Sequence, residues 1–254
     1  MADEVVRTRD GHVEVLTLNR PEARNAINLA LAQQLGHALD ECTVDDEVWA
    51  VVITAAGDKA FSAGMDLKAF AQGEFPATEQ GFAGIAERHF PKPLICAANG
   101  SAYAGGFEVV LSCDLVVAAD HAVFGIPEVS RGLIAGGGGL IRLARRIPRA
   151  VALEMALTGE PISAARAFEV GLVNAVLPSD EVLPHALALA QRICANAPSA
   201  VRRSKSLMIE SMDLDEATAW SLNNAAFAEI AAGPDALEGA VAFAEKRPPV
   251  WQGR

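Results

Sequence analysis

The sequence predicts an α/β fold, in which short strands alternate with helices over most of the chain. Apolar runs of strand length recur between residues 5 and 118, and the segments between them repeat their apolar residues with helical spacing. Alternation of strands with helices of about 8–15 residues is typical of α/β architectures. The chain has 254 residues, of which 51% are hydrophobic. It can therefore bury a sizeable core, as one large domain or as one domain with a smaller appendage.

The N-terminal segment predicts a β-hairpin followed by a helix. Val5–Arg9 and the alternating run His12–Leu18 flank an Asp10-Gly11 turn. Asn28 is typical of a helix N-cap, because its side-chain oxygen can accept a hydrogen bond from a free backbone N–H. The helix that follows carries one apolar face, made of Leu31, Leu35, Ala38, Leu39 and Cys42.

Strands and helices continue to alternate through the middle of the chain. Residues 49–54 predict a buried strand, and a short helix begins near Asp66. A second buried strand is expected over 93–98, a helix begins at the glycine pair 105–106, and a further strand covers 115–118. Each apolar run is too short to cross a membrane, which needs about 18 or more consecutive apolar residues.

The pattern changes beyond residue 179, where strand signals are nearly absent. Helices are predicted at about 180–195, 199–211, 214–232 and 234–245. A run of helices after an α/β body is either a lid or an oligomerisation arm, and packing on its own body is an equal alternative. We therefore divide the chain into an α/β core, residues 1–195, and a helical oligomerisation region, residues 196–254.

Charge and cysteine content limit the possible partners and location. With 21 basic and 32 acidic residues the net charge is −11, which argues against a nucleic-acid-binding protein. An anionic ligand would be repelled overall and needs local donors. The four cysteines are far apart without a metal-ligating pattern, and the N-terminus has no secretory apolar segment. We expect reduced thiols, no metal site, no membrane association and a cytoplasmic protein.

Two carboxylates stand in apolar surroundings that should not tolerate them. Glu108 lies within SAYAGGFEVVLSC, and Glu128 follows Pro127 within VFGIPEVSRGL. Burial of a carboxylate without a partner is costly and usually raises its pKa. Two such acids could act as general acid and general base in one pocket. The alternative is that each glutamate is a surface cap at a helix N-terminus.

Two glycine turns precede predicted helices and offer free backbone donors. The pair 105–106 stands before Glu108, and Gly64 lies in the similar segment FSAGMD. The first N–H groups of a helix lack intrahelical partners, and glycine lets a ligand approach them closely. Two such turns can each direct one N–H at a single oxygen, which makes an oxyanion hole for an enolate or a tetrahedral oxyanion.

Two other kinds of site are not supported by the sequence. Residues 136–139 are consecutive glycines but lack the G-x-x-x-x-G-K-[ST] pattern of a phosphate loop. We interpret them as a close-packed helix start that helps to shape the pocket. The sequence has no G-x-S-x-G motif, and none of its five histidines has a nucleophile motif beside it. A hydrolytic triad is therefore not expected.

Several segments together resemble the enoyl-CoA hydratase/isomerase, or crotonase, superfamily. They are NRPEARNA (19–26), FSAGMDLK (61–68), NGSAYAGGFEVVLSCD (99–114), FGIPEVSRGL (124–133), LTGEPISAARAFEVGLVNAVLP (157–178) and AFAEKRPPVWQGR (242–254). The resemblance implies a crotonase-like spiral of ββα units with a helical C-terminal trimerisation region, in a homotrimer or a dimer of trimers. It also implies a lyase of fatty acid metabolism that acts on an acyl-CoA thioester and has no cofactor beyond the coenzyme A of its substrate.

The resemblance further implies the chemistry and its residues. The backbone N–H groups of Met65 and Gly105 would form the oxyanion hole, and Glu108 and Glu128 would be the catalytic residues of an enoyl-CoA hydratase. Hydratases of the family keep both acids, twenty residues apart as here. Glu108 would activate a water for attack at C3 of a 2-enoyl-CoA, and Glu128 would deliver a proton to C2.

Substrate-binding residues are implied in the same way. They are Arg24, Ala63, Asp66, Leu67, Lys68 and Lys246, the last reaching a ligand of the neighbouring subunit. Asp66 is more typical of a helix cap than of a catalyst. The stretch 70–93, with Phe70, Phe75, Phe82 and Phe90, would form much of the acyl pocket.

Three alternatives remain open within and beside this family. FSAGMDLKAFAQGE and DALEGAVAFAEKRPPVWQGR are similar to segments of carnitinyl-CoA dehydratases, which keep the same acids. An enoyl-CoA isomerase of the same fold and a non-catalytic acyl-CoA-binding protein are the others. The chain also departs from the family pattern, because Ala104 replaces a usual glycine, Ala135 a common proline and Met65 a frequent alanine.

Overall fold

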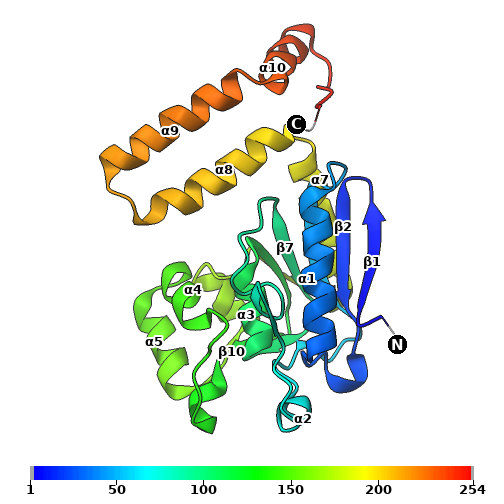
Figure 1. Cartoon of the computed structure of the whole chain (residues 1–254), viewed down its shortest axis with the longest axis vertical. Helices are drawn as coiled ribbons and strands as arrows, with labels where there is room; N and C mark the ends of the chain where they lie inside the picture. The colour runs from blue at the N-terminus through cyan, green and yellow to red at the C-terminus, as the bar shows by residue number, and fades with distance from the viewer. Residues whose placement is uncertain (1–2, 253–254) are drawn as a thin grey trace.

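A six-stranded sheet forms the centre of the computed structural model, which describes residues 3–252 (Figure 1). Its strand order is β1 (Val5–Asp10), β2 (Val13–Leu18), β3 (Ala50–Ala55), β7 (Leu94–Ala98), β9 (Leu115–Ala119) and β12 (Ala175–Leu177). The hairpin β1–β2 is antiparallel, and all other neighbours are parallel. The predicted hairpin and the strands near 49–54, 93–98 and 115–118 are confirmed.

A smaller sheet lies beside the first and leads into the helix that carries Glu108. Its order is β11 (Ile162–Ser163), β10 (Val123–Gly125), β8 (Ser101–Tyr103) and β4 (Ala60–Ser62), and a separate two-stranded ribbon pairs β5 (Ala77–Thr78) with β6 (Gly81–Phe82). The strands β4, β8 and β10 run parallel. Strands of two or three residues are too short to show a two-residue period, which is why the sequence did not predict them.

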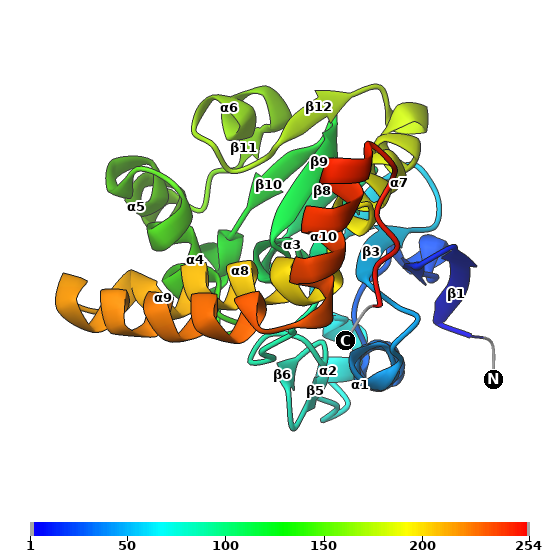
Figure 2. The ribbon, with the colours of Figure 1, turned by 90° about the horizontal axis from the view of Figure 1, so that it is seen from above.

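Helices cover the sheets and connect their strands. They are α1 (Leu29–Val44), α2 (Leu67–Phe70), α3 (Gly105–Ser112), α4 (Gly139–Arg146), α5 (Arg149–Thr158), α6 (Ala164–Glu169) and α7 (Ser179–Cys194), with 3-10 segments η1 (Pro21–Ala23) and η2 (Pro127–Arg131). Asn28 caps α1 as predicted, with its Oδ1 2.9 Å from Leu31 N. The large sheet lies between α1 and α7 (Figure 2). In the described part of the chain, none of the helices combines the length and the apolar character that crossing a bilayer requires.

The core is densest along the central parallel strands. Every residue of β3 and β7 is buried, as expected for strands covered by helices on both faces. Phe107 and Phe124 meet beneath the smaller sheet with ring centroids 5.6 Å apart. This packing joins α3 to the smaller sheet and fixes the helix that carries Glu108.

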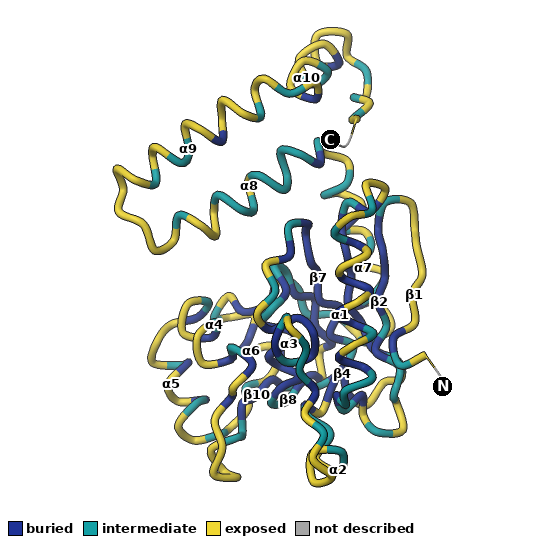
Figure 3. The backbone as a smooth tube through the Cα atoms, viewed as in Figure 1, coloured by how far each residue is buried: buried dark blue, intermediate teal, exposed yellow. Residues whose placement is uncertain are grey.

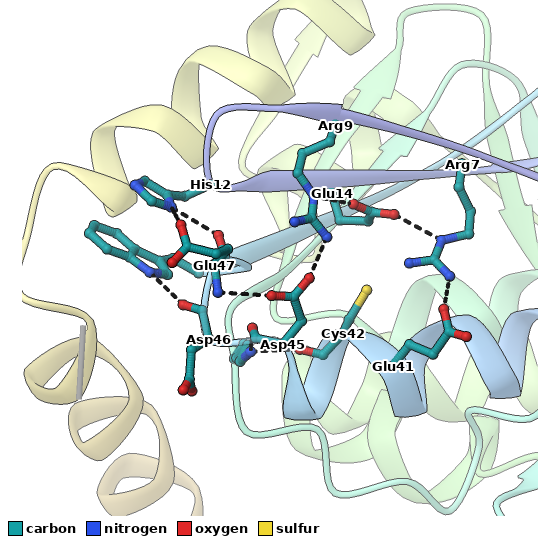
Figure 4. A network of polar contacts seen from close by, with 11 residues as sticks. Arg7, Arg9, His12, Glu14, Glu41, Cys42, Asp45, Asp46 and Glu47 are labelled. Carbon is teal, nitrogen blue, oxygen red and sulfur yellow. Dashed lines mark hydrogen bonds and ion pairs between the residues drawn. The ribbon is translucent and has the colours of Figure 1, made fainter. Parts of the chain in front are cut away.

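A polar network fastens the N-terminal hairpin to α1 (Figure 4). Glu14 of β2 is 4% exposed, and its two oxygens accept hydrogen bonds of 2.8 Å from Arg7 Nε and Arg9 Nε. Arg7 also contacts Glu41, and Arg9 Nη2 lies 2.6 Å from Asp45 Oδ2. A buried carboxylate is stable only when it is paired. Both oxygens of Glu14 are paired, so the network holds the hairpin over α1.

The C-terminal helices extend from the body as an arm (Figure 1). The arm consists of α8 (Pro198–Glu210), the 3-10 segment η3 (Ser211–Asp213), α9 (Glu216–Ala231) and α10 (Pro234–Glu245), close to the predicted helix bounds. Lys205 joins α8 to the body, with its Nζ 2.6 Å from Asp114 Oδ2 and 2.8 Å from Lys92 O. Much of α9 and α10 is exposed (Figure 3). The division of the chain at residue 195 stays a prediction.

Candidate active site

Two glycine turns interlock at the N-terminus of α3. Gly64 follows β4 with φ +90°, and a Cβ at this position would lie 2.8 Å from Tyr103 O and 3.1 Å from Gly105 N. A Cβ at Gly106 would lie 2.5 Å from Ser62 O. Side chains at these positions would force β4 and α3 apart, so both turns need glycine. The close approach brings the two predicted donor segments together.

The backbone amides of Met65 and Gly105 lie beside this contact. Ile27 N donates to Gly64 O and Asp66 N donates to Ile27 O, both at 2.8 Å, so the bridge between Ile27 and Met65 does not use the Met65 N–H. Gly105 is the first residue of α3, where N–H groups have no partner within the helix. Within the described part of the chain, neither amide has a hydrogen-bond acceptor. Both predicted donors are therefore available to a ligand.

Glu108 is buried on α3, with 3% of its surface exposed. Its Oε1 accepts a 2.8 Å hydrogen bond from Gly139 N. Burial raises the pKa of this carboxyl and outweighs the hydrogen bonds from Gly139 and Gly137 and the charge of Arg142, which lower it. The alternative that Glu108 is a surface cap is therefore wrong, because its carboxylate contacts the glycine tract instead of the end of its own helix.

The glycine tract 136–139 encloses the Glu108 carboxylate. A Cβ at Gly137 would lie 2.6 Å from Glu108 Oε2, and one at Gly139 would lie 3.0 Å from Oε1. A Cβ at Gly136 would meet nothing within 4 Å. The predicted close-packed helix start is confirmed, since α4 begins at Gly139. The carboxylate fits because the two glycines that face it have no side chain.

Glu128 lies in η2 and differs from Glu108 in its hydrogen bonding. Burial raises the pKa of its carboxyl, the negative charge of Glu108 adds to that rise, and a backbone hydrogen bond and Arg131 oppose it. The parallel neighbours β8 and β10 lead into α3 and η2, so the two glutamates follow adjacent strand ends. Glu128 Oε2 is buried and has no hydrogen-bond partner within residues 3–252. A buried oxygen without a partner is costly unless a water or ligand meets it.

Arg142 is a site residue that the sequence did not predict. Its Nη2 donates to Ala86 O at 2.5 Å and its Nη1 to Gly137 O at 3.4 Å. Its positive charge lowers the pKa of Glu108, while burial lowers its own pKa. The guanidinium also fills the space beside Gly138, whose φ is +91°. Arg142 therefore supports the tract that holds Glu108 and joins it to Ala86, 56 residues away in the sequence.

The segment after Gly64 lies at the surface, as a channel segment should. Asp66 caps α2, with its Oδ1 3.1 Å from Lys68 N, and its Oδ2 lies 3.0 Å from Arg20 Nη1. Burial acts to raise the pKa of Asp66, but these hydrogen bonds outweigh it and the pKa is lowered. The interpretation of Asp66 as a helix cap is confirmed. Ala63, Leu67 and Lys68 are exposed.

Arg24 borders a small hollow beside this segment. Its exposed side chain follows a backbone with φ +53°, and its carbonyl accepts a 3.0 Å hydrogen bond from Ala63 N. The hollow has a volume of about 160 Å³ and is also lined by Asp58 and Lys59. Lys59 is a second cation that the sequence did not single out. Lys246 is elsewhere, at the end of α10, which Figure 1 shows at the opposite end of the molecule from α2.

Comparison with known proteins gives consistent matches over the full length. Residues 8–254 match the model of the family described as enoyl-CoA hydratase/isomerase. The carnitinyl-CoA dehydratase of Escherichia coli K12 is 38% identical, and the match covers 100% of both chains.

Solved structures also match the chain over its full length. An enoyl-CoA hydratase from Mycobacterium tuberculosis H37Rv is 45% identical with a TM-score of 0.97. A carnitinyl-CoA hydratase from Mycobacterium avium is 47% identical with a TM-score of 0.81. Each match covers 100% of both chains.

Proposed function

The chain belongs to the enoyl-CoA hydratase/isomerase family, and from this premise we propose that water reacts with its substrate between Glu108 and Glu128. Its relatives are hydratases and dehydratases, so the chain is a hydro-lyase that acts on CoA thioesters. The predicted crotonase-like fold with a helical C-terminal region is confirmed. One observation supports the proposal: burial raises the pKa values of Glu108 and Glu128, which follow the adjacent parallel strands β8 and β10, and the amide of Gly105, at the start of the Glu108 helix, is free.

The amides of Met65 and Gly105 bind the thioester carbonyl oxygen in this proposal. Addition of water at C3 moves negative charge onto that oxygen, in an enolate-like state. Gly105 is at the positive end of α3, so the helix dipole favours the same charge. Loss of one such donor costs on the order of 10²–10³ in kcat.

Glu108 is the general base in the hydration direction. Its carboxylate accepts a hydrogen bond from Gly139 N and feels the charge of Arg142, and both favour the ionised form. Glu108 therefore takes a proton from water as the oxygen attacks C3. Glu128 is the general acid, because burial and, to a smaller extent, the charge of Glu108 raise its pKa, and its buried oxygen is free to carry a proton. Dehydration runs through the same steps in reverse.

A carnitinyl-CoA dehydratase is the second candidate, and a specific observation favours it. A dehydratase and a hydratase named for carnitinyl-CoA are 38% and 47% identical to the chain over its full length. The same two acids would serve this reaction. An isomerase of the same fold would return its proton to another carbon instead of holding water between the acids.

The CoA portion of the substrate lies along the exposed segment that follows Gly64. Arg24 and Lys59 line one hollow, and Lys68 projects from α2 nearby in the chain. These cations offset the net charge of −11 that would repel CoA phosphates. We expect Lys59→Ala to raise KM several-fold with little change in kcat, more so at low salt.

Assembly through the arm is also proposed. Large apolar side chains are exposed on α8 to α10, among them Met208, Trp220, Phe227, Leu237 and Phe243. Apolar faces of this extent usually meet a partner. We propose a homotrimer or a dimer of trimers, in which Lys246 approaches the ligand of a neighbouring subunit. The protein would work in the cytoplasm, in fatty acid metabolism, with no cofactor besides the CoA of its substrate.

A panel of 2-enoyl-, 3-enoyl- and 3-hydroxyacyl-CoA thioesters, read by mass, tests the function. Hydration adds one water, dehydration removes one and isomerisation leaves the mass unchanged. Carnitinyl-CoA belongs in the same panel. Glu108→Gln should abolish each activity found, while Glu160→Gln, a change at an exposed glutamate, should not. A wild-type protein that transforms none of these thioesters contradicts the proposal.

A further inference from the structure

The ring of Phe82 stands against the first residue of α3. A Cβ placed on Gly105 would overlap this ring, at the atoms Cε1 and Cζ. The ring therefore occupies the space into which any side chain at position 105 would extend. Since the Gly105 amide is a proposed donor to the thioester oxygen, Phe82 lies directly beside the thioester end of the substrate.

Phe82 also borders the space where the acids act. Gly105 and Glu108 are three residues apart on α3, so their side-chain directions lie on the same face of the helix. The Phe82 ring and the Glu108 carboxylate are therefore on one side of α3. An acyl chain that leaves the thioester carbonyl and passes Glu108 must run along this side.

The turn that presents Phe82 is built tightly. Gly81, Ala83 and Gly84 all have left-handed backbone angles, with φ of +77°, +56° and +70°. Such an angle is unfavourable for alanine, so the surroundings must impose it. A Cβ at Gly84 would overlap Ala32 O of α1. The chain around Phe82 therefore has little freedom to move.

Two arginines hold this turn to the rest of the site. Arg88 donates to Gly84 O at 3.1 Å and to Gly36 O at 3.0 Å, which fixes the turn to α1. Arg142 donates to Ala86 O and supports the glycine tract around Glu108. Arg142 therefore helps to fix both the Phe82 ring and the Glu108 carboxylate.

Two further rings extend from Phe82 toward the surface. Phe75 lies edge-on to Phe82 with centroids 6.5 Å apart, and Phe70 lies edge-on to Phe75 at 6.4 Å. Phe75 and Phe70 are 55% and 45% exposed, whereas Phe82 is half-buried. The edge-on contact of Phe75 favours the observed position of the Phe82 ring. Phe90 is not part of the row, because it is buried in the core beneath Lys205.

We propose that Phe82 closes the acyl pocket beside Gly105 and makes the enzyme selective for short acyl groups. The proposal rests on the proposed function, because it takes Gly105 and Glu108 as the points between which the substrate lies. It goes further by naming the residue that limits the substrate. Each methylene that finds an apolar space contributes roughly a factor of four to binding. Loss of the ring should therefore favour long chains steeply.

The test compares butenoyl-CoA with decenoyl-CoA in wild type and in Phe82→Ala. We expect the wild type to have a kcat/KM for butenoyl-CoA at least about tenfold above that for decenoyl-CoA. In Phe82→Ala this ratio should fall about tenfold or more, mainly through KM for decenoyl-CoA. Phe82→Leu, which keeps much of the volume, should change the ratio less. Phe168→Ala, at an exposed phenylalanine of α6, is the matched control and should leave the ratio unchanged.

Binding of saturated butanoyl-CoA and decanoyl-CoA, measured by calorimetry, gives a readout that needs no turnover. If the wild type binds both but hydrates no enoyl-CoA, the proposed reaction fails while chain selection is still measured. A wild type that binds and hydrates both chain lengths equally overturns the inference. So does a folded Phe82→Ala or Phe82→Leu variant whose chain-length ratio equals that of the wild type.

Discussion

The segments that carry the two glutamates differ in how they hold a carboxylate. Glu108 lies on a regular helix. Its carboxylate accepts a hydrogen bond from a backbone N–H and lies against glycines, which have no side chain to displace it. Glu128 is on a five-residue 3-10 segment, and one of its oxygens is buried without a partner in the described chain. The first segment stabilises a charge, and the second leaves a carboxyl oxygen free. Burial raises both pKa values, and the difference in polar contacts is what the proposed division into a base, Glu108, and an acid, Glu128, rests on.

The largest effect should come from neutralising either acid. Glu108→Gln and Glu128→Gln should each reduce kcat by about 10²–10⁴. Glu108→Gln can still accept the Gly139 N–H through its amide oxygen, so its loss of activity should come without loss of fold. Steady-state kinetics with a good substrate, together with circular dichroism, check this. An active Glu128→Gln variant would remove the division of roles between the segments.

A smaller loss of activity should follow from adding a methyl group to the glycine tract that encloses the Glu108 carboxylate. A Cβ at Gly137 would lie 2.6 Å from Glu108 Oε2, and the carboxylate is the part that can yield. We expect Gly137→Ala to fold but to lose activity on the order of 10²-fold, the cost of misplacing a catalytic group by about 1 Å. Gly136→Ala is the control, because a Cβ there meets nothing within 4 Å. Equal activities of the two variants would show that the glycine tract does not position Glu108.

The pH dependence of kcat/KM should reflect the different roles of the two glutamates. The base must be ionised and the acid protonated, so kcat/KM should fall below the pKa of Glu108 and above that of Glu128. Arg142 lowers the pKa of Glu108, so Arg142→Gln should move the acid limb to higher pH. Arg142→Lys keeps the charge and should move this limb less. The alkaline limb should stay in place in both variants. A shift of that limb alone would show that Arg142 acts on the pKa of Glu128 instead of that of Glu108.

The smallest expected effect is a change in melting temperature when Glu128 is replaced by Gln. The folded-state pKa of Glu128 is raised, so this group favours the folded state below its unfolded pKa and loses that contribution as pH rises through the folded value. Glu128→Gln does not ionise and should match the wild-type melting temperature near pH 4. It should exceed the wild type near pH 8 by a few degrees, at about 2–4 °C per kcal/mol for a chain of this size. A variant that melts lower than the wild type at pH 8 contradicts this sign.

Sequence patterns predicted the parts of the fold that repeat over several residues. The structure contains the hairpin, the helix capped by Asn28 and the strand within 49–54. Each of them has an apolar pattern that extends over several residues. The short strands β4, β8 and β10 position the active site, yet two or three residues carry no measurable period.

The candidate site was predictable only in part. Apolar neighbours and adjacent glycines distinguish Glu108 in the sequence, so its burial could be predicted. Its hydrogen bond to Gly139 spans 31 residues, and the contact of Arg142 with Ala86 spans 56. Nothing local marks such pairs, because they form only when the elements pack. The roles of Met65, Gly105, Glu108 and Glu128 stay predictions.

The paired Glu14 has a consequence for how copies of the protein avoid misassembly. β1 is an edge strand, and a free edge invites another chain to add a strand. The guanidinium groups that bind Glu14 keep charge along this edge, and the opposite edge, β12, is only three residues long. Replacing Arg7 and Arg9 by uncharged residues would remove this charge and leave Glu14 unpaired, and the loss would appear as lower stability and as aggregation in concentrated solution rather than as slower turnover.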